Sequence, residues 1–402
     1  MRETFSHAIL AFALFTTTYA VNLQAPLYSV YAENSGVGAT AVTIGFAAYV
    51  AGLMPTLILL GGMSDRIGRR LPVAMALALG VGGTALLVVA PTWPSLVFAR
   101  FVLGVSTGFA TTAGTAYMAE LFSQDRTRQA TLLVTSATSL GFGGGALATG
   151  LSLAQWGPSI MPVSFVALFL VAPILALVVL ALPKADNPQR VAMLRLPVFP
   201  ERTWQYGMAL ALAWSTTGMT IAVVPLQLHE QGLGAYTGLV IFLAIFVGFL
   251  SQPLARRLTS ISALRVGLVL VPLGFLTVLV GVWLQEIWLV LAGTAITSSA
   301  SYGFTYLSSL SEFAIRAPDN RARAAAGLFV YAYVGFSLPT IASGAMADKF
   351  GLLTAMSVFA SLLVAITIAV GWLGRSTGRT EPTNLTEEPT FRGESATAVK
   401  SG

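Results

Sequence analysis

Apolar segments of about 20 residues recur along the whole chain of 402 residues and constrain its fold more than any other feature. A helix of that length crosses about 30 Å of hydrocarbon. Only 9% of the residues are charged, whereas a typical soluble domain has about 25%. The chain is therefore predicted to be an all-α polytopic membrane protein that lies within a lipid bilayer.

Twelve of these segments are predicted to be transmembrane helices. They lie at residues 7–31, 39–62, 71–92, 94–119, 129–153, 160–182, 204–228, 236–255, 263–284, 287–312, 324–347 and 352–373. The first follows Arg2 and resembles a secretory signal peptide, but its apolar stretch continues to Ala32 and is longer than a signal core. It is therefore interpreted as the first span.

The positive charges predict how the spans are oriented. If both termini are cytoplasmic, the even-numbered connections and the termini hold 20 of the 22 Lys and Arg residues. Such an excess is expected of cytoplasmic loops. The two exceptions are Lys349, in an outer connection, and Arg100, within the fourth span.

The polar breaks predict the division into domains. Residues 183–203 form the longest internal polar break and are predicted to be a central cytoplasmic loop. This loop separates a six-helix bundle at residues 1–182 from a second at residues 204–373. Residues 374–402 are rich in Thr, Glu, Gly and Pro and are predicted to be a disordered cytoplasmic tail.

Several classes of function are not supported by the composition. There is no cysteine, and the two histidines, His7 and His229, are far apart in sequence, so neither a metal site nor a cofactor is predicted. No catalytic dyad or nucleotide-binding loop is visible, and an enzyme is not predicted. The net charge of +6 is attributed to cytoplasmic loops rather than to nucleic-acid binding.

The segment Gly61–Arg70, GGMSDRIGRR, carries four charges between two apolar spans and has a second copy. Its pattern of Gly, Ser, Asp and two Arg recurs as Gly, Ser, Gln and two Arg in Gly248–Arg257, at the same spacing. Glu120 and Glu312, after the fourth and tenth spans, are each followed by an Arg-x-Arg-x-Ala sequence. These repeats predict a duplicated six-helix unit and two pseudo-symmetric bundles.

The segment Gly61–Arg70 resembles the loop signature of the major facilitator superfamily, G-x-L-x-D-R-x-G-R-[RK]. The twelve spans, the central loop and the weaker second copy agree with this resemblance, which covers residues 1 to about 373. The resemblance implies a transporter that works by alternating access. It also implies a conformational latch formed by Gly61, Asp65, Arg66, Gly68, Arg69, Arg70 and Glu120.

The resemblance assigns roles within this latch. Asp65 is expected to face the start of the eleventh helix, where a helix dipole favours a carboxylate. Arg69 is expected to reach Glu120 at the end of the fourth span. Gly61 and Gly68 are expected to permit close helix approach and a tight turn. In the second copy Gln252 replaces the aspartate, so a weaker latch is predicted there.

Arg100 is the only ionisable residue well within a span. A guanidinium in hydrocarbon is costly, so Arg100 is predicted to serve an anionic or polar substrate or to tune a nearby proton site. The alternative is a packing arginine that reaches out to the membrane interface. No Asp or Glu lies in the middle of any predicted span, which disfavours strongly cationic substrates.

The other residues predicted to line a substrate cavity lie on the first, seventh and tenth spans, which face the cavity in the superfamily. The alternative for polar residues there is ordinary helix packing. With Arg100, the predicted cavity residues are Tyr19, Asn22, Gln24, Trp214, Tyr302 and Tyr306.

The predicted function is secondary active transport of a small organic solute across the cytoplasmic (inner) membrane by a monomer. Overall length and short outer loops resemble bacterial efflux permeases, so efflux is expected, with proton antiport as one form of coupling. However, Phe142 stands where proton antiporters of the family have proline. The alternatives are an importer of a sugar, amino acid or organic acid, and a transport-inactive membrane sensor.

Overall fold

The computed structural model describes residues 2–122, 126–183, 194 and 196–377. Within these residues the secondary structure is helical, without any strand. Twelve helical segments there are long and apolar enough to cross a membrane, which confirms the predicted all-α fold and its twelve spans. Most of the predicted central loop and the predicted tail from residue 378 lie outside the described residues.

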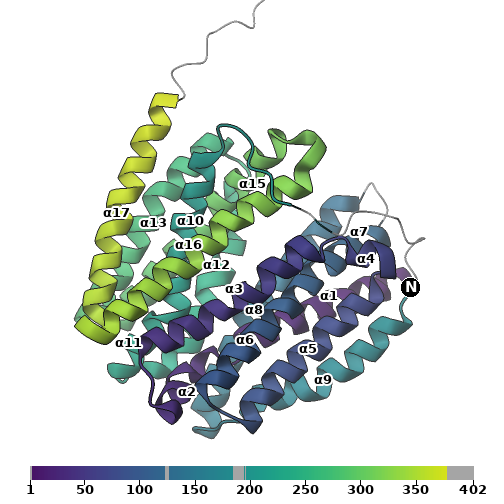
Figure 1. Ribbon diagram of the computed structural model, residues 1–402, viewed down its shortest axis with the longest axis horizontal. Helices are drawn as coiled ribbons and strands as arrows, with labels where there is room; N and C mark the ends of the chain where they lie inside the picture. Colours follow the sequence, from purple (N-terminus) through teal and green to yellow (C-terminus); the bar gives the residue numbers. More distant parts are fainter. Residues whose placement is uncertain (1, 123–125, 184–193, 195, 378–402) are drawn as a thin grey trace, which may run out of the picture.

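The helices form two groups, called here the first half (residues 2–183) and the second half (residues 196–377). In Figure 1 the first half, purple to blue, lies below and to the right of the second half, teal to yellow. The first half contains α1 (Arg2–Asn22), η1 (Ala25–Leu27), α2 (Tyr28–Ser35), α3 (Ala39–Leu59), α4 (Met63–Ile67), α5 (Arg70–Val89), α6 (Trp93–Phe109), η2 (Ala110–Gly114), α7 (Thr115–Leu121), α8 (Thr127–Trp156) and α9 (Val163–Ala181). The second half contains α10 (Trp204–Ala222), α11 (Val224–Glu230), η4 (Gly234–Tyr236), α12 (Thr237–Ala255), α13 (Ser260–Leu284), α14 (Ile287–Ser298), η5 (Ser299–Thr305), α15 (Tyr306–Ile315), η6 (Pro318–Asn320), α16 (Arg321–Phe350) and α17 (Leu352–Thr377).

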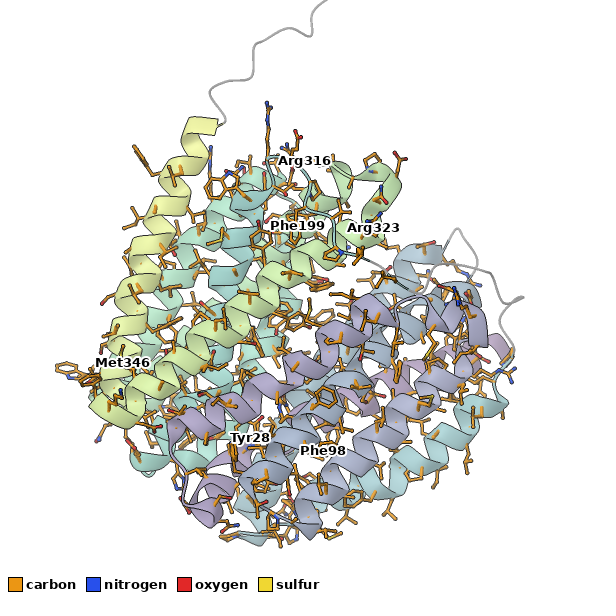
Figure 2. All side chains as sticks on the ribbon, viewed as in Figure 1. Tyr28, Phe98, Phe199, Arg316, Arg323 and Met346 are labelled. Atoms are coloured by element: carbon orange, nitrogen blue, oxygen red, sulfur yellow. The ribbon has the colours of Figure 1, made fainter. Side chains whose placement is uncertain are left out.

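Packing within each half follows the same plan. In the first half α3 packs on α6, α1 on α8, and α5 on α9; the corresponding pairs in the second half are α12 with α14, α10 with α16, and α13 with α17. Two helix pairs, α3 with α16 and α8 with α12, form most of the interface between the halves. Large apolar side chains project from the outer surface, including that of Phe98 on α6 (Figure 2). Such a surface is suited to lipid rather than to water.

The first and seventh predicted spans are each broken rather than being single helices. In the first, α1 ends at Asn22 and α2 begins at Tyr28, with Pro26 in η1 between them. In the seventh, α10 ends at Ala222 and Pro225 lies in the first turn of α11. Proline has no backbone N–H, so the helical hydrogen bond to the residue four positions earlier cannot form. The same break therefore recurs at matching places in the two halves.

The fourth and tenth predicted spans are also irregular at matching places. The π-helical turn η2 interrupts the fourth between α6 and α7, and the π-helical turn η5 interrupts the tenth between α14 and α15. Such turns add a residue to the helix and occur often at functional sites. In η5 the hydroxyl of Thr305 donates to the carbonyl of Ala300, five residues earlier, at 2.7 Å.

Glycines allow α3 and α6 to cross closely. A Cβ atom added at Gly104 would lie 2.8 Å from the backbone nitrogen of Leu53, and one added at Gly52 would lie 3.1 Å from that of Val105. In membranes, small residues of this kind let helix backbones approach one another. This crossing holds Arg100, one turn before Gly104, against α3.

We predict that Gly104→Leu destabilises the first half by about 3 kcal/mol, because the new side chain has no space at the crossing. The measurement is the thermal unfolding midpoint in detergent, with the yield of monodisperse protein. Gly82→Leu is the matched control, because a Cβ atom at Gly82 meets nothing within 4 Å. Equal stability of the two variants would contradict the close crossing.

Candidate functional site

The predicted latch segment forms a compact turn at the end of α3. Gly61 is buried in the turn before α4. The helix α4 contains Asp65 and the exposed Arg66. Gly68 ends α4 with a φ of 88°, a conformation that a side chain would strain. The membrane side on which this turn lies is called here the arginine-rich side.

Arg69 joins the turn to the end of the fourth span. Its Nη1 lies 2.5 Å from Oδ1 of Asp65, and its Nη2 lies 2.6 Å from Oε1 of Glu120 on α7. Nη1 also donates to Oγ of Ser64 at 2.7 Å. Burial acts to lower the pKa of Arg69, but the hydrogen bonds and charges of Glu120 and Asp65 outweigh it and raise the pKa. The structure therefore shows the expected contact of Arg69 with Glu120 and adds one with Asp65 that was not predicted. The expected contact of Asp65 with the start of the eleventh span stays a prediction.

Arg70 has a different set of partners. Its Nη1 donates to the carbonyl of Leu180 at 3.0 Å, and its Nε donates to that of Pro183 at 3.2 Å. These carbonyls lie at the end of α9, where backbone acceptors have no partner within the helix. Arg70 thus caps α9, and its role in the latch stays a prediction.

The second copy of the motif makes different contacts. Gln252 donates to the carbonyl of Tyr302 at 3.3 Å. Glu312 pairs with Arg316, four residues later in the chain, at 3.2 Å. Glu120, in contrast, pairs with Arg69, which lies between the second and third spans. The charged bridge of the first half is thus replaced in the second half by a neutral amide and a local pair.

Arg100 lies inside the first half and is only 1% exposed. Its Nη1 donates to the carbonyl of Val21 at 2.7 Å, and its Nη2 donates to that of Phe46 at 3.3 Å. The guanidinium carbon lies 4.8 Å from the ring centroid of Tyr49, within the range of a cation–π contact. Its Nε has no partner within the described protein. The side chain therefore does not reach out to the membrane interface, as the alternative expected, but it does pack between helices, buried among α1, α3 and α6.

The other six predicted cavity residues separate into two groups. Trp214, Tyr302 and Tyr306 belong to one aromatic cluster in the second half, in which the rings of Trp214 and Tyr302 lie 5.5 Å apart. Tyr306 lies beside Phe329, with centroids 6.4 Å apart. These three residues, predicted from the seventh and tenth spans, therefore belong to the same part of the structure.

Tyr19, Asn22 and Gln24 lie within the first half instead. Tyr19 donates to the carbonyl of Ser164 on α9, and Asn22 donates to that of Phe142 on α8. Gln24 donates to the carbonyl of Val21, which Arg100 also contacts. Their role in a cavity stays a prediction, and in this structure they support the break in the first span.

The sequence reasoning missed the aromatic residues that α3 and α16 bring to the same place. Tyr333 lies 5.1 Å from Trp214, and Phe336 of α16 lies 4.7 Å from Phe46 of α3, between ring centroids. The ring of Phe336 also lies 6.2 Å from that of Trp214, so α3 and α16 both contribute to the cluster. The aromatic residues of the second and eleventh spans were the signal for this in the sequence.

The two halves meet most closely at the side opposite the arginine-rich side. There the carboxylate of Asp348, near the end of α16, accepts hydrogen bonds from the backbone N–H groups of Ala39 and Thr40, at 2.7 and 3.0 Å, and from the Thr40 hydroxyl. These donors form the first turn of α3, where free N–H groups and the helix dipole favour an anion. Asp348 thus joins the halves through the start of α3.

Further contacts between the halves lie at the same side. A Cβ atom added at Gly344 would lie 2.9 Å from the carbonyl oxygen of Ala39, and one added at Gly150 would lie 3.1 Å from Cα of Gly238. At the ends of α2 and α11, Nε2 of His229 lies 3.1 Å from Oε1 of Glu33. The helix pairs α3–α16 and α8–α12 are therefore closed at this side.

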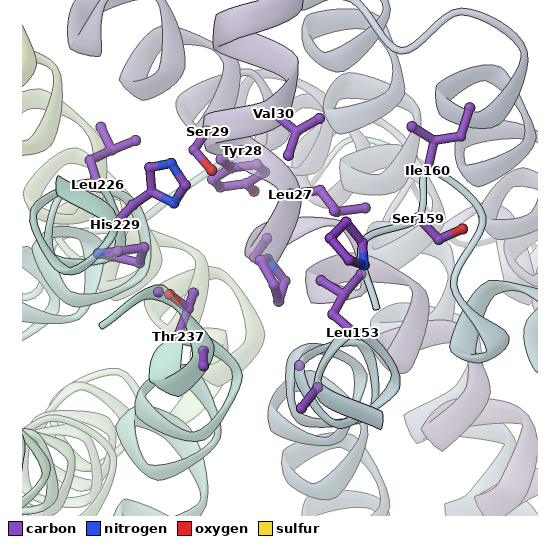
Figure 3. Close-up of a pocket in the computed structure, with 18 of the residues that line it drawn as sticks. Leu27, Tyr28, Ser29, Val30, Leu153, Ser159, Ile160, Leu226, His229 and Thr237 are labelled. Atoms are coloured by element: carbon purple, nitrogen blue, oxygen red, sulfur yellow. The ribbon is translucent and has the colours of Figure 1, made fainter. Parts of the chain in front are cut away.

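A pocket of about 600 Å³ lies between the halves near this closure. Figure 3 shows Leu27, Tyr28 and Ser29 from the break of the first span opposite Leu226 and His229 from the seventh. None of the seven predicted cavity residues lines it. The pocket is therefore separate from the aromatic cluster and from Arg100.

We predict that Asp348→Asn separates the start of α3 from the end of α16, because a neutral amide is held less strongly by a helix N-terminus, by about 1 kcal/mol. The chain has no cysteine, so spin labels placed singly on these two ends give an unambiguous distance. Glu286→Gln, on the same side between α13 and α14, is the matched control. An unchanged distance distribution for Asp348→Asn would contradict a closure held by this carboxylate.

Comparison with known proteins places this geometry in a family. A family model described as Major Facilitator Superfamily matches residues 10–340. A comparison with curated protein sequences gives no significant match. Among solved structures, a bacterial homologue of the human lysosomal transporter Spinster, in an inward-facing and occupied conformation, is similar with a TM-score of 0.73 and 14% identity over 94% of this chain and 97% of the other.

A variant of the nucleoside transporter NupG is similar with a TM-score of 0.76 and 15% identity, over 92% of this chain and 99% of the other. At these identities the likeness is one of fold. The family model covers most of the chain and includes the latch segment, Arg100, the broken spans and the aromatic cluster. The chain belongs to the major facilitator superfamily and is a multi-pass membrane transporter rather than an enzyme.

Proposed function

We propose that this protein is a secondary active transporter that moves a small organic solute by alternating access, and that the structure represents its inward-facing state. The observation that carries the proposal is the closure of α3 on α16 through Asp348, at the side opposite the arginine-rich side. If the arginine-rich side is cytoplasmic, as its charges predict, this closure lies at the outer surface. The cytoplasmic (inner) membrane is the proposed location, with both termini in the cytoplasm.

The helix pair α3–α16 supports a switch with a carboxylate at each end. The two helices run in opposite directions, with the start of α3 at the end of α16. The end of α3 and the start of α16 therefore both point toward the arginine-rich side. Asp348 binds the start of α3 in this state. Asp65, beyond the end of α3, is the corresponding carboxylate for the start of α16. We propose that the two contacts alternate as the halves rock.

Within this switch Arg69 and Glu120 act as a brace for Asp65. Arg69 contacts both carboxylates, so it fixes the position of Asp65 relative to the fourth span. All three residues lie in the first half, and their contacts do not depend on the second half. The brace can therefore stay intact in both states, while the contact between Asp65 and α16 forms only in the outward-facing state.

The aromatic cluster and Arg100 support a neutral, amphiphilic or weakly anionic substrate. Trp214, Tyr302 and Tyr306 offer flat apolar surface with polar edges, which suits a planar organic molecule. The Nε1 of Trp214 has no partner in the described protein and is available as a donor. Arg100 supplies the nearby positive charge, held beside Tyr49, which disfavours a cation.

The direction that we propose is export, in exchange for protons, as the resemblance to efflux permeases implies. The alternative is uptake of a sugar, amino acid or organic acid. The similar structures include both a homologue of a lysosomal transporter and a nucleoside transporter, so fold likeness does not favour one substrate. A transport-inactive sensor is the least supported alternative, because the switch and the aromatic cluster are both present.

The test is solute flux in proteoliposomes with an imposed pH gradient, over anionic, neutral and cationic compounds that share an aromatic ring. We expect the neutral and weakly anionic compounds to cross the membrane in the direction opposite to the flow of protons. We expect the cationic compounds not to be transported. Movement together with protons would instead support the importer. Transport of the cations alone would overturn the proposed substrate class, and no flux of any compound would favour the sensor.

Asp65→Asn is predicted to slow transport. It should raise the free energy of the outward-facing state by about 1–2 kcal/mol, the upper range for a carboxylate at a helix N-terminus. Initial rates in proteoliposomes measure the effect, with Glu286→Gln as the control. Insertion and thermal stability should stay close to those of the original protein. A normal rate for Asp65→Asn would refute the proposed latch.

Arg100→Ala is predicted to reduce transport or to change the preference between anionic and neutral compounds, because it removes the positive charge held against Phe46, a ring in contact with Phe336. Arg100→Lys separates charge from geometry, since lysine keeps the charge but cannot reproduce the fork that reaches Val21 and Phe46. Parallel measurements of folded yield identify a purely structural role. A large loss of yield with unchanged specific transport would contradict the functional assignment.

A further inference from the structure

A groove of about 670 Å³ lies on the outer surface of the second half, between α13 and α17. Most of its wall is apolar, with Leu268, Leu273 and Leu276 from α13 and Ile368 from α17. It is remote from the interface between the halves and shares no residue with the predicted latch or cavity. The transport mechanism proposed above gives it no role.

One end of the groove is polar and positively charged. Arg265 of α13 and Gln205 of α10 lie there, beside Trp372 of α17. Arg265 lies about 8 Å along α13 from its start at Ser260, and Leu276 about 24 Å. The groove therefore runs from the arginine-rich side of the membrane, where α13 begins, to a level past the middle of that helix.

Arg265 is exposed within this polar end and has no ion-pair partner in the described part of the chain. A guanidinium at the edge of the hydrocarbon binds phosphate oxygens well, because its fork of donors matches them. Basic pockets between transmembrane helices on the cytoplasmic side bind anionic lipid headgroups for this reason.

Thr367 gives an independent sign that the groove has an occupant. Its side chain lines the groove and is 6% exposed, yet its Oγ1 has no hydrogen-bond partner in the described protein. A buried hydroxyl normally has a partner, which for threonine in a helix is often the carbonyl four residues earlier. Oγ1 itself is enclosed in this structure, so a rotation of the side chain would bring its hydroxyl to an acceptor on a molecule that lies in the groove.

The depth of Thr367 fits one kind of molecule. The helices α13 and α17 pack against each other and run in opposite directions. The last residue of α13, Leu284, and the first of α17, Leu352, are therefore taken as level with each other. Arg265 is thus level with Gly371, and Thr367 lies about 6 Å deeper in the membrane. In a glycerophospholipid the ester carbonyls lie below the phosphate in the same order.

We propose that the groove is a binding site for a glycerophospholipid with an anionic headgroup, from the leaflet on the arginine-rich side. Arg265 and Gln205 bind its phosphate, the hydroxyl of Thr367 donates to an ester carbonyl oxygen, and one acyl chain fills the apolar length of the groove. A helix of another protein fits the site poorly, because its backbone acceptors are already used within the helix.

The test is native mass spectrometry of the purified full-length protein after incubation with phosphatidylglycerol or phosphatidylcholine of the same acyl chains. We expect phosphatidylglycerol to be retained preferentially. Arg265→Ala should reduce its retention about fivefold, the effect of one arginine near an anionic membrane surface. Thr367→Val, which keeps the shape of the side chain, should give a smaller reduction with either lipid. Arg256→Ala, an exposed arginine outside the groove, is the charge control.

A steric variant tests the site independently of charge. Gly371 lines the groove, and a Cβ atom there meets nothing within 4 Å. Gly371→Leu should therefore fill the groove without disturbing the fold and abolish retention, whereas Gly82→Leu, on the surface of the first half, should retain lipid normally. Normal retention by Gly371→Leu would overturn the site. Equal retention of the two lipids, unaffected by Arg265→Ala, would overturn the assignment of the headgroup.

Discussion

The constraint on which this structure depends is that backbone polar groups inside a lipid bilayer need partners within the protein. The chain meets it with helices almost throughout, so the places where a helix is interrupted need special support. At the break of the first span, the carbonyl of Val21 accepts from both Arg100 and Gln24. The side chain that is most costly to place in the membrane thus satisfies a backbone carbonyl beside the break that contains Pro26. The hydrogen bond to Val21 also holds the buried guanidinium of Arg100 next to Tyr49.

The duplication explains why irregular features of the helices occur twice. Features that do not recur show where the two halves have become different. Proline breaks in the first and seventh spans and π-helical turns in the fourth and tenth recur at matching places. The charged network of Asp65, Arg69 and Glu120 does not recur, since Gln252 and the pair of Glu312 with Arg316 take its place. The two halves therefore differ in their charged contacts at the arginine-rich side.

The helix pair α3–α16 gives a physical account of how two such bodies can exchange states. Each helix N-terminus is a site for an anion. Asp348, near the end of α16, binds the start of α3, and the proposed switch assigns the start of α16 to Asp65. In the structure the pair is joined at one end by Asp348, with Phe46 and Phe336 in contact further along. A contact of this kind is strong enough to bias an equilibrium, yet weak enough to be exchanged for its counterpart at the opposite end. The aromatic cluster lies along the same pair, so movement of the halves alters its surroundings directly.

The sequence by itself determined the twelve spans and the repeat, because apolar length and motif spacing are local properties of the chain. The contact of Arg69 with Glu120, 51 positions apart, was expected from the family resemblance, and so was the placing of Trp214, Tyr302 and Tyr306 on spans that meet. The sequence did not determine the closure through Asp348, the arrival of Phe46 and Tyr333 at the same cluster, or the burial of Arg100 inside the first half. These depend on how α3 crosses α6 and where the two halves touch. Only the tertiary structure decided them, because the crossing is set by close glycine contacts such as that of Gly104 with Leu53, and because contacts between the halves join residues about 300 positions apart, as Asp348 and Ala39 are.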